Sequence, residues 1–471
     1  MSTLPHQLSL SELAEALARG EITSRAATES SLARLKAIGP KLNAVVLIEE
    51  EQALAAADRA DAARKAGKPL GLLHGVPLTH KDLFYRRGRP CAGGSKIRQG
   101  FVPQATATAL NRLDAAGALD LGTLHMAEFA LSPTGYNEPY GHARNPWNTA
   151  HVTGGSSSGS GAAVAARLIS ASLGSDTGGS IRHPAAMCGL TGLKPTWSRV
   201  SRANAMPLSW SLDCIGPLAQ TARDCARIMQ VIAGADIADP TASHMPVPDY
   251  ASQLNGHLKN LTIAVPGNYY YEHVTPGVKK ALDDSLTALR DLGAKTVTTR
   301  VPDMALINAL MIVVMAVEAA SIHRNWLATR PDDYADQVRS RIEPGLYYPA
   351  TRYTEALSLR AKIAAEYVAS AMQGADLLHL PTLSIPVPSI AETTAGDPAA
   401  IAAKIGAITH CTRGINYLGL PALAVPCGFV DALPVSFQLV GKPFTEALLL
   451  RAGDAYQRVT DWHKRLPPLA A

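Results

Sequence analysis

The chain has 471 residues, of which 47% are hydrophobic and 18% are charged, so it can bury a large core and is not disordered. The 44 basic and 39 acidic residues leave a net charge of +5. This excess is too small and too dispersed for a nucleic-acid-binding surface.

The first 70 residues are predicted to form a helical lead. Ser9 and Glu12 make a capping box ahead of a leucine-rich stretch that Gly20 ends. Two more helices are predicted over 23–38 and 49–66. Because the start lacks a basic segment followed by an apolar one, we expect no signal peptide and a cytoplasmic location.

Apolar strand runs then alternate with helical stretches, which favours an α/β fold whose sheet is covered on both faces. The only linker-like segment, 238–254, is short, so we expect one large domain over 1–471. The predicted strands are 72–79, 118–122, 169–173, 261–265, 296–301, 377–380, 422–425 and 435–439, and the predicted helices are 106–116, 157–167, 276–292 and 446–459.

Residues 304–367 are predicted to be mostly helical. The apolar run 305–317 is interrupted by Asn308 and falls short of the roughly 20 residues that a membrane span needs, so we expect a buried helix and no membrane partner. Tyr347 and Tyr348 lie in a loop-like stretch that could line a substrate pocket.

The cysteines indicate reduced, mostly buried thiols. They are scattered, with no CxxC pair and no histidine at the spacing of a zinc site, so we expect no metal. The six are Cys91, Cys188, Cys214, Cys225, Cys411 and Cys427.

Two glycine-framed serine clusters carry most of the functional information. Ser156 lies in GGSSSGSGAAVAA and Ser180 lies in DTGGSIRHPA, 24 positions later. Glycine lets the backbone approach a reacting group closely, and the alanine-rich helix that follows the first cluster is not typical of a flexible spacer. The pattern therefore indicates a built site.

Lys81 directly follows the apolar strand predicted at 72–79. Sites of α/β proteins form at strand ends, although most lysines are simply solvated. If Lys81 points inward, burial lowers its pKa and makes the neutral amine a usable base for a serine nucleophile.

An alternative interpretation starts from the GxSxG pattern centred on Ser157, which matches a nucleophile elbow. An elbow needs a strand immediately upstream, whereas residues 145–153 read as a loop. It also needs an Asp and a His later in the chain, and no spacing identifies them.

Together these segments resemble the amidase signature family. The motifs are GVPLTHKD around Lys81, the two serine clusters at the family's 24-residue spacing, and CGLTGLKPT from Cys188, all within a core at 70–230. Weaker agreement extends to GLPALAVPCG at 419–428. The resemblance implies a single domain with a central mixed, twisted β-sheet, and hydrolysis of carboxamide C–N bonds without a cofactor.

The resemblance also implies the roles of the site residues. Ser180 would be the nucleophile, Ser156 the bridging serine and Lys81 the base, in a Ser-Ser-Lys triad that forms an acyl-enzyme. The bridging serine of the family follows a cis peptide, here the bond between Gly155 and Ser156.

Main-chain N–H groups of Thr177, Gly178, Gly179 and Ser180 match the family's oxyanion hole. Asp176 and Arg182 are interpreted as support for this loop rather than as catalytic groups. Turn and helix-cap roles are the simpler interpretation of Ser158 and Ser160.

The substrate is the least defined part of the prediction. We expect a small amide or carbamate together with water, with aryl anilides and esters as alternatives, and a monomer or homodimer. Leu131, Ser132, Tyr136 and Tyr347 are the candidate substrate-binding residues. The chain is more similar, on its motifs, to stand-alone bacterial amidases, because 330–367 lacks the stretches that the amidase subunits of tRNA-dependent amidotransferases carry. A glutaminase component of such an amidotransferase is the second alternative.

Overall fold

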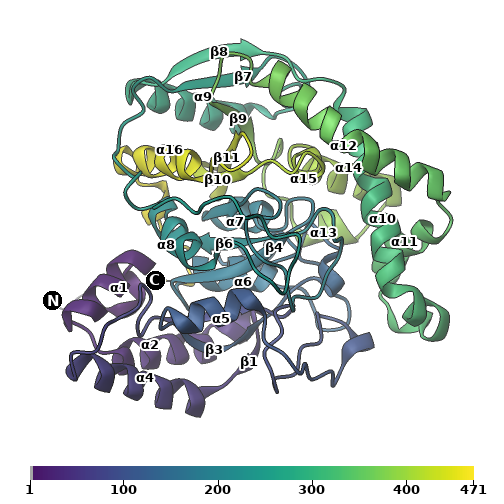
Figure 1. Ribbon diagram of the computed structural model, residues 1–471. Coiled ribbons are helices and arrows are strands. Elements are labelled where there is room, and N and C mark those ends of the chain that lie inside the picture. The colour runs from purple at the N-terminus through teal and green to yellow at the C-terminus, as the bar shows by residue number, and fades with distance from the viewer. Residues whose placement is uncertain (1–3, 471) are drawn as a thin grey trace.

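Eight strands form one large mixed sheet at the centre of the computed structural model, which describes residues 4–470 (Figure 1). Their order is β4-β6-β5-β10-β11-β9-β7-β8, antiparallel from β4 to β9 and parallel from β9 to β8. The predicted α/β fold with a mixed sheet is confirmed. The strands are β4 Ala171–Asp176, β5 Thr191–Lys194, β6 Cys214–Ala219, β7 Thr262–Pro266, β8 Lys295–Thr299, β9 Leu377–Pro381, β10 Ala422–Val430 and β11 Leu433–Gly441.

Helices cover both faces of this sheet, and the alternation along β10 shows how. Leu423 and Val425 belong to the core cluster that includes Leu449 of α16 (Glu446–Val459) and residues of α8 (Ala222–Ile232) and α9 (Pro276–Asp291). Ala424, with the opposite parity, belongs to the cluster of α6 (Ser158–Ala165) and α7 (Arg182–Cys188). Successive strand side chains point to opposite faces, so the two helix groups lie on opposite sides.

A second, three-stranded sheet has the order β1-β3-β2. Its strands are β1 Val45–Ile48, β2 Pro77–Lys81 and β3 Leu119–Leu124. The prediction of a first strand at 72–79 was wrong at both ends, because Leu72 is half exposed and residues 71–76 form hydrogen-bonded turns. Lys81 is consequently the last residue of the strand rather than a residue after it.

The N-terminal helices agree with the sequence, with Ser9 and Glu12 forming the expected capping box. Three strands were missed. Strand β1, within the segment predicted to be a helical lead, and strand β5 have four residues each, and β6 contains glycine and proline. The remaining helices are α1 Leu10–Arg19, α2 Ser24–Ala37, α3 Gly39–Leu42, α4 Glu50–Lys65, α5 Thr108–Ala115, α10 Met304–Thr329, α11 Asp336–Ile342, α12 Ala350–Ala371, α13 Ile390–Thr394, α14 Pro398–Thr409 and α15 Arg413–Tyr417.

Helix α10 is the one helix within residues 4–470 that is long and apolar enough, by length and composition, to cross a membrane. Its Ile307, Met311 and Val314 are buried in a core cluster that includes Tyr367 of α12. Core helices pass the same test of length and composition. Helices α10, α11 and α12 confirm that 304–367 is mostly helical.

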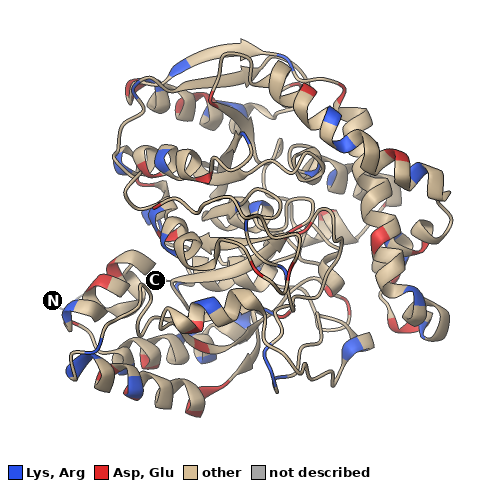
Figure 2. Cartoon of the chain, in the orientation of Figure 1, with Lys and Arg blue, Asp and Glu red and all other residues tan. Residues whose placement is uncertain are grey.

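Charged side chains of both signs are interspersed along the outer helices in the view of Figure 2. Ion pairs between exposed residues four positions apart, such as Lys279 and Asp283 on α9, occur on these helices. All six cysteines are free and buried, as predicted.

Candidate active site

Lys81 reaches the candidate site because β2 packs beside β4, the edge strand of the large sheet. The backbone N–H of Leu173 donates to His80 Nδ1 over 3.1 Å, and Ser172 Oγ donates to the carbonyl oxygen of Thr79 over 2.8 Å. These bonds join the two sheets and set β2 against β4. Lys81, at the end of β2, therefore lies next to the end of β4.

The side chain of Lys81 is completely buried and contacts two serines. Its Nζ lies 2.7 Å from Ser156 Oγ and 2.9 Å from Ser175 Oγ. Burial lowers the pKa of Lys81 to about 7, against the opposing effect of the negative charges of Asp213 and Asp176. A substantial fraction of the amine is therefore neutral near pH 7 and able to accept a proton.

The first serine cluster forms a turn that leads into α6. The Gly155–Ser156 peptide bond is cis, as the resemblance implied. Ser156 is fully buried, and its carbonyl oxygen accepts from the N–H of Ala127 over 3.1 Å. The N–H of Ser157 donates to the carbonyl oxygen of Ser180 over 3.3 Å, so the two serine clusters are in direct backbone contact.

The second cluster is the loop between β4 and α7, and Ser180 lies on it beside a cavity. Ser180 is 8% exposed, whereas Ser156 has no exposed surface. Within residues 4–470 the structure records no hydrogen bond from the Ser180 hydroxyl, including none to Ser156. Catalytic hydrogen bonds are often long in unliganded enzymes and tighten only when substrate binds.

One of the four backbone N–H groups that were expected to face the substrate, that of Gly179, is already hydrogen-bonded within the loop. The N–H of Gly179 donates to Asp176 Oδ1 over 2.7 Å, so it is already satisfied and is not free for an oxyanion. Across the described part of the chain, the N–H groups of Thr177, Gly178 and Ser180 have no recorded partner. Of the four amides predicted to form an oxyanion hole, three therefore remain available.

Asp176 and Arg182 form a fully buried ion pair, with 3.1 Å between Nε and Oδ2. Burial alone would raise the pKa of Asp176, but the charge and hydrogen bonds of Arg182 outweigh it and hold that pKa well below its usual range. Arg182 also donates to Gln438 of β11 and to Asn416 of α15. The pair fixes the loop, and neither residue lines the cavity beside Ser180, which agrees with a supporting role.

A cavity of about 120 Å³ opens beside Ser180. Leu131 and Ser132 line it, as predicted, but Tyr136 and Tyr347 do not. The hydroxyl of Tyr136 donates to Glu138 instead, and Tyr347 is 83% exposed. The lining residues are Ala130, Leu131, Ser132, Pro133, Thr177, Gly178, Ser180, His183, Leu208, Met311, Met315, Arg341, Ile405, Thr409 and Arg413.

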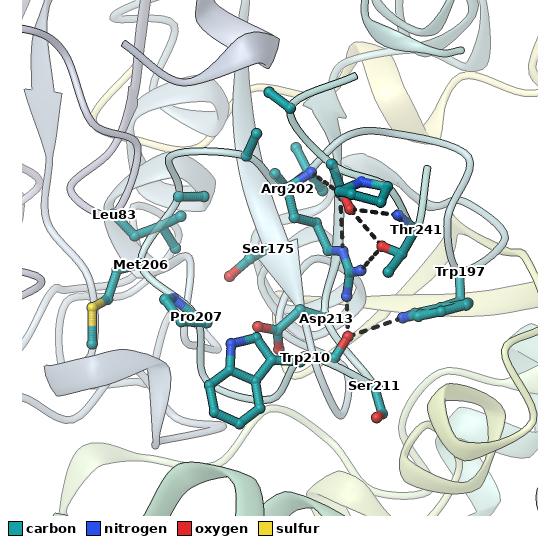
Figure 3. A pocket seen from close by; sticks show the side chains of 16 residues that line it. Leu83, Ser175, Trp197, Arg202, Met206, Pro207, Trp210, Ser211, Asp213 and Thr241 are labelled. Atoms are coloured by element: carbon teal, nitrogen blue, oxygen red, sulfur yellow. Dashed lines mark hydrogen bonds and ion pairs between the residues drawn. The ribbon is translucent and has the colours of Figure 1, made fainter. Parts of the chain in front are cut away.

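A second and larger cavity, about 510 Å³, is lined by Ser175, the second serine that Lys81 contacts (Figure 3). Figure 3 shows Leu83 and Met206 on one side of it and Arg202 and Trp197 on the other. Asp213 also lines it and accepts a hydrogen bond from the Thr177 hydroxyl over 2.6 Å, so the two cavities share one wall. Ser156 and Ser180 do not line this larger cavity.

The elbow interpretation of Ser157 finds no support in the geometry. Its side chain is fully buried, donates to the carbonyl oxygen of Ser175 over 3.4 Å and accepts from the N–H of Ser175 over 3.3 Å. The segment upstream is a loop, with only an isolated bridge at His151 and Val152. Ser157 therefore acts as a connection between α6 and β4.

Sequence reasoning missed Ser175, Asp213 and His183. Ser175 directly precedes the DTGGS motif at the end of a strand, and this position could have identified it. Burial lowers the pKa of His183 to about 4, so the ring is neutral, and its Nε2 lies 2.8 Å from the Thr412 hydroxyl. Among residues 4–470, no group of three His, Cys, Asp or Glu side chains is placed to hold a metal ion.

Comparisons with known proteins agree on the family. The family model described as Amidase matches residues 26–450. The A subunit of the glutamyl-tRNA(Gln) amidotransferase from Roseiflexus sp. (strain RS-1) is 42% identical and covers 99% of both chains.

Two solved structures are similar over almost the whole chain. One, from a vestigial protein complex that reveals the evolutionary origins of an s-triazine catabolic enzyme, has a TM-score of 0.89 at 34% identity and covers 96% of this chain and 98% of its own. The native peptide amidase from Stenotrophomonas maltophilia has a TM-score of 0.83 at 28% identity and covers 98% of both. The high identity to an amidotransferase component runs against the expectation that stand-alone amidases are the nearer relatives. The chain belongs to the amidase family.

Proposed function

We propose that this protein hydrolyses carboxamide C–N bonds with Ser180 as nucleophile, Ser156 as proton relay and Lys81 as base. The observation that carries the proposal is the buried contact of 2.7 Å between Lys81 Nζ and Ser156 Oγ, next to a cavity that Ser180 lines. A lysine with a pKa of about 7 is suited to accept a proton at neutral pH.

In the first half of the reaction, Ser180 Oγ forms a bond to the carbonyl carbon of the amide. Its proton passes to Ser156 while Ser156 passes one to Lys81. The N–H groups of Thr177, Gly178 and Ser180 stabilise the negative charge on the carbonyl oxygen. The C–N bond then breaks as the relay returns a proton to the leaving nitrogen. Ammonia or an amine departs, and Ser180 carries the acyl group.

In the second half, water attacks the acyl-enzyme. Lys81 accepts the water proton through Ser156, and the C–O bond to Ser180 breaks with return of that proton to Ser180 Oγ. A carboxylic acid is released. The same steps would act on a carbamate, an aryl anilide or an ester, because the oxyanion hole binds the carbonyl group and the cavity selects the substituents.

A second candidate is a glutaminase role within a tRNA-dependent amidotransferase. It is favoured by the 42% identity to the A subunit of such an enzyme over 99% of the chain. Assay of the purified chain alone separates the two candidates. Turnover of simple amides by the lone protein supports the free-standing hydrolase, whereas glutaminase activity that appears only with partner proteins supports the second candidate.

Two serine variants test the assignment of the nucleophile. We expect Ser180→Ala to lose turnover by at least about a thousandfold and to form no acyl adduct in mass spectrometry, because no other group can take the acyl chain. Ser157→Ala should keep substantial activity, since that side chain makes only supporting bonds to Ser175. Equal losses in the two variants would contradict the assignment.

A further inference from the structure

Two arginines line the cavity beside Ser180, and neither has an acidic partner. Arg341 near the end of α11 donates to the carbonyl oxygen of Leu131, and Arg413 at the start of α15 donates to the hydroxyl of Thr409 over 2.5 Å. Within residues 4–470, no carboxylate lies within 4.0 Å of either guanidinium. The fifteen lining residues include no Asp or Glu.

Both side chains are only partly exposed, and within residues 4–470 no carboxylate balances either charge. A guanidinium has five N–H donors, and each of these uses one in its recorded hydrogen bond. Burial, together with the smaller effect of the nearby positive charge of Arg413, lowers the pKa of Arg341 to about 10. Two cations that share one small cavity repel each other unless an anion lies between them.

We propose that the substrate is a small amide bearing a carboxylate, which Arg341 and Arg413 bind while Ser180 attacks the amide carbonyl. This inference rests on the proposed hydrolase function and specifies its substrate class. A planar carboxylate accepts paired hydrogen bonds from guanidinium groups, so the donors left unused by protein partners match it.

The rest of the cavity restricts the linker between the two groups of the substrate. Met311, Met315 and Ile405 present apolar surface, which suits a short chain of methylene groups. A volume of about 120 Å³ corresponds to only a few water molecules. Monoamides of short dicarboxylic acids, such as malonamate, succinamate and glutaramate, have this combination of size, apolar linker and charge.

The same surroundings disfavour glutamine. Its α-ammonium would enter a cavity lined by two cations and no carboxylate, and would lose its hydration without gaining an ion pair. Glutaramate is glutamine without the ammonium group. The pair therefore isolates the effect of that charge on binding.

The first test compares matched amides on the native protein. We expect kcat/KM for succinamate to exceed that for butyramide, its uncharged analogue with a methyl group in place of the carboxylate, by at least about a hundredfold, since two charged contacts are lost. Glutaramate should exceed glutamine by at least about tenfold. Hydrolysis of butyramide as fast as succinamate, or of glutamine as fast as glutaramate, would overturn the substrate class while leaving the hydrolase function intact.

The second test removes the guanidiniums. Arg341→Met and Arg413→Met should each lower kcat/KM for succinamate by at least about tenfold more than they lower that for butyramide. Arg339→Met is the matched control on α11, because Arg339 is partly exposed and pairs with Asp332 outside the cavity. Equal losses on both substrates in the cavity variants would mean a structural role and would overturn the proposal.

A binding measurement separates this inference from the proposed function. Succinate, the product of succinamate hydrolysis, should bind the inactive Ser180→Ala variant in calorimetry, and its affinity should fall at least about tenfold when Arg341 or Arg413 is also replaced by Met. Succinate binding by an enzyme that hydrolyses no amide would support the carboxylate site and contradict the hydrolase. Amide turnover without succinate binding would do the reverse.

Discussion

At the scale of single residues, the proposed chemistry depends on a lysine held in its neutral form. Among residues 4–470, the amine of Lys81 is hydrogen-bonded only to the hydroxyl groups of Ser156 and Ser175, and the nearest negative charges oppose the effect of burial on its pKa without cancelling it. A carboxylate in direct contact would have kept the ammonium protonated. The hydroxyl-only surroundings of the amine, within the part of the chain that the structure describes, therefore suit the role of base that we propose for Lys81.

The pH dependence of activity follows from this pKa. The pKa of Lys81 is lowered from 10.5 to about 7, so the neutral base is lost as the pH falls below that value. We expect kcat/KM to fall about tenfold per pH unit below about pH 7 and to level off above it. A profile that is flat from pH 5 to pH 8 would show that Lys81 is not the base.

Lys81→Met tests the same group through stability. In the unfolded chain the amine is protonated up to its ordinary pKa, so the native protein releases a proton on folding between about pH 7 and pH 10. The native protein therefore gains stability with rising pH across this window, and the Met variant does not.

The free energy of unfolding of the variant minus that of the native protein should therefore decrease by roughly 1.4 kcal/mol per pH unit from pH 7 to pH 10. Chemical denaturation at several pH values measures it, and turnover of the variant should be undetectable. A difference independent of pH would mean that Lys81 is charged in the folded state over this range.

At the scale of elements, the loop between β4 and α7 sets the geometry around Ser180. Gly179 has φ of +131°, a conformation that side chains rarely adopt, and a Cβ there would meet the ring of His183 and the hydroxyl of Thr412. Its N–H donates to Asp176. This single residue turns the chain so that Gly178 and Ser180 keep their N–H groups free.

Alanine at the two glycines of this loop should therefore have different effects. Gly179→Ala should cost on the order of 1–3 kcal/mol of stability and lower kcat by at least about tenfold, because the backbone must rotate. Gly178→Ala is the control, since its Cβ would meet only the terminal methyl of Met311, at 3.2 Å. Thermal unfolding and kcat of both variants decide the point, and equal effects would refute a special role of the turn.

The sequence predicted those helices and strands that are marked by a pattern within their own residues. The capping box at Ser9, the alanine-rich start of α6 and the apolar runs of β7 and β10 are of this kind. Strands β5 and β6 were not predicted because both of their faces are buried. Short buried strands with glycine or proline do not show the alternation of apolar and polar residues that marks a half-exposed strand.

The candidate site also contains residues that local motifs indicate and residues that only the folded structure reveals. Lys81, Ser156 and Ser180 lie in motifs with a family resemblance, so the sequence alone was enough to nominate them, and the structure places Lys81 in contact with Ser156. Arg341 and Arg413 lie on separate short helices 72 positions apart, and only tertiary packing brings them to one cavity. The bond from Gly179 to Asp176 likewise depends on a backbone angle that no composition reveals.

At the scale of the whole molecule, the order of strands interleaves the two halves of the sequence. Strand β5 from the first half pairs with β10 from the second, and β11 separates β10 from β9. Arg182 also links the two halves of the sequence, because it donates hydrogen bonds to Asp176 in the first half and to Gln438 of β11 in the second. Separation of the halves would expose the edge of β5 and leave a buried charge without its partners.

This topology predicts that the chain unfolds as one cooperative unit rather than as two domains. Urea unfolding followed by tryptophan fluorescence and by far-ultraviolet circular dichroism should give coincident transitions, because the five tryptophans, from Trp147 to Trp462, report on both halves of the sequence. Arg182→Met should shift both transitions together to lower urea, by about 3–5 kcal/mol in the free energy of unfolding, since it leaves Asp176 buried and unpaired. Two separated transitions, or a shift confined to one probe, would show instead that part of the chain folds independently of the sheet in which β5 and β10 are paired.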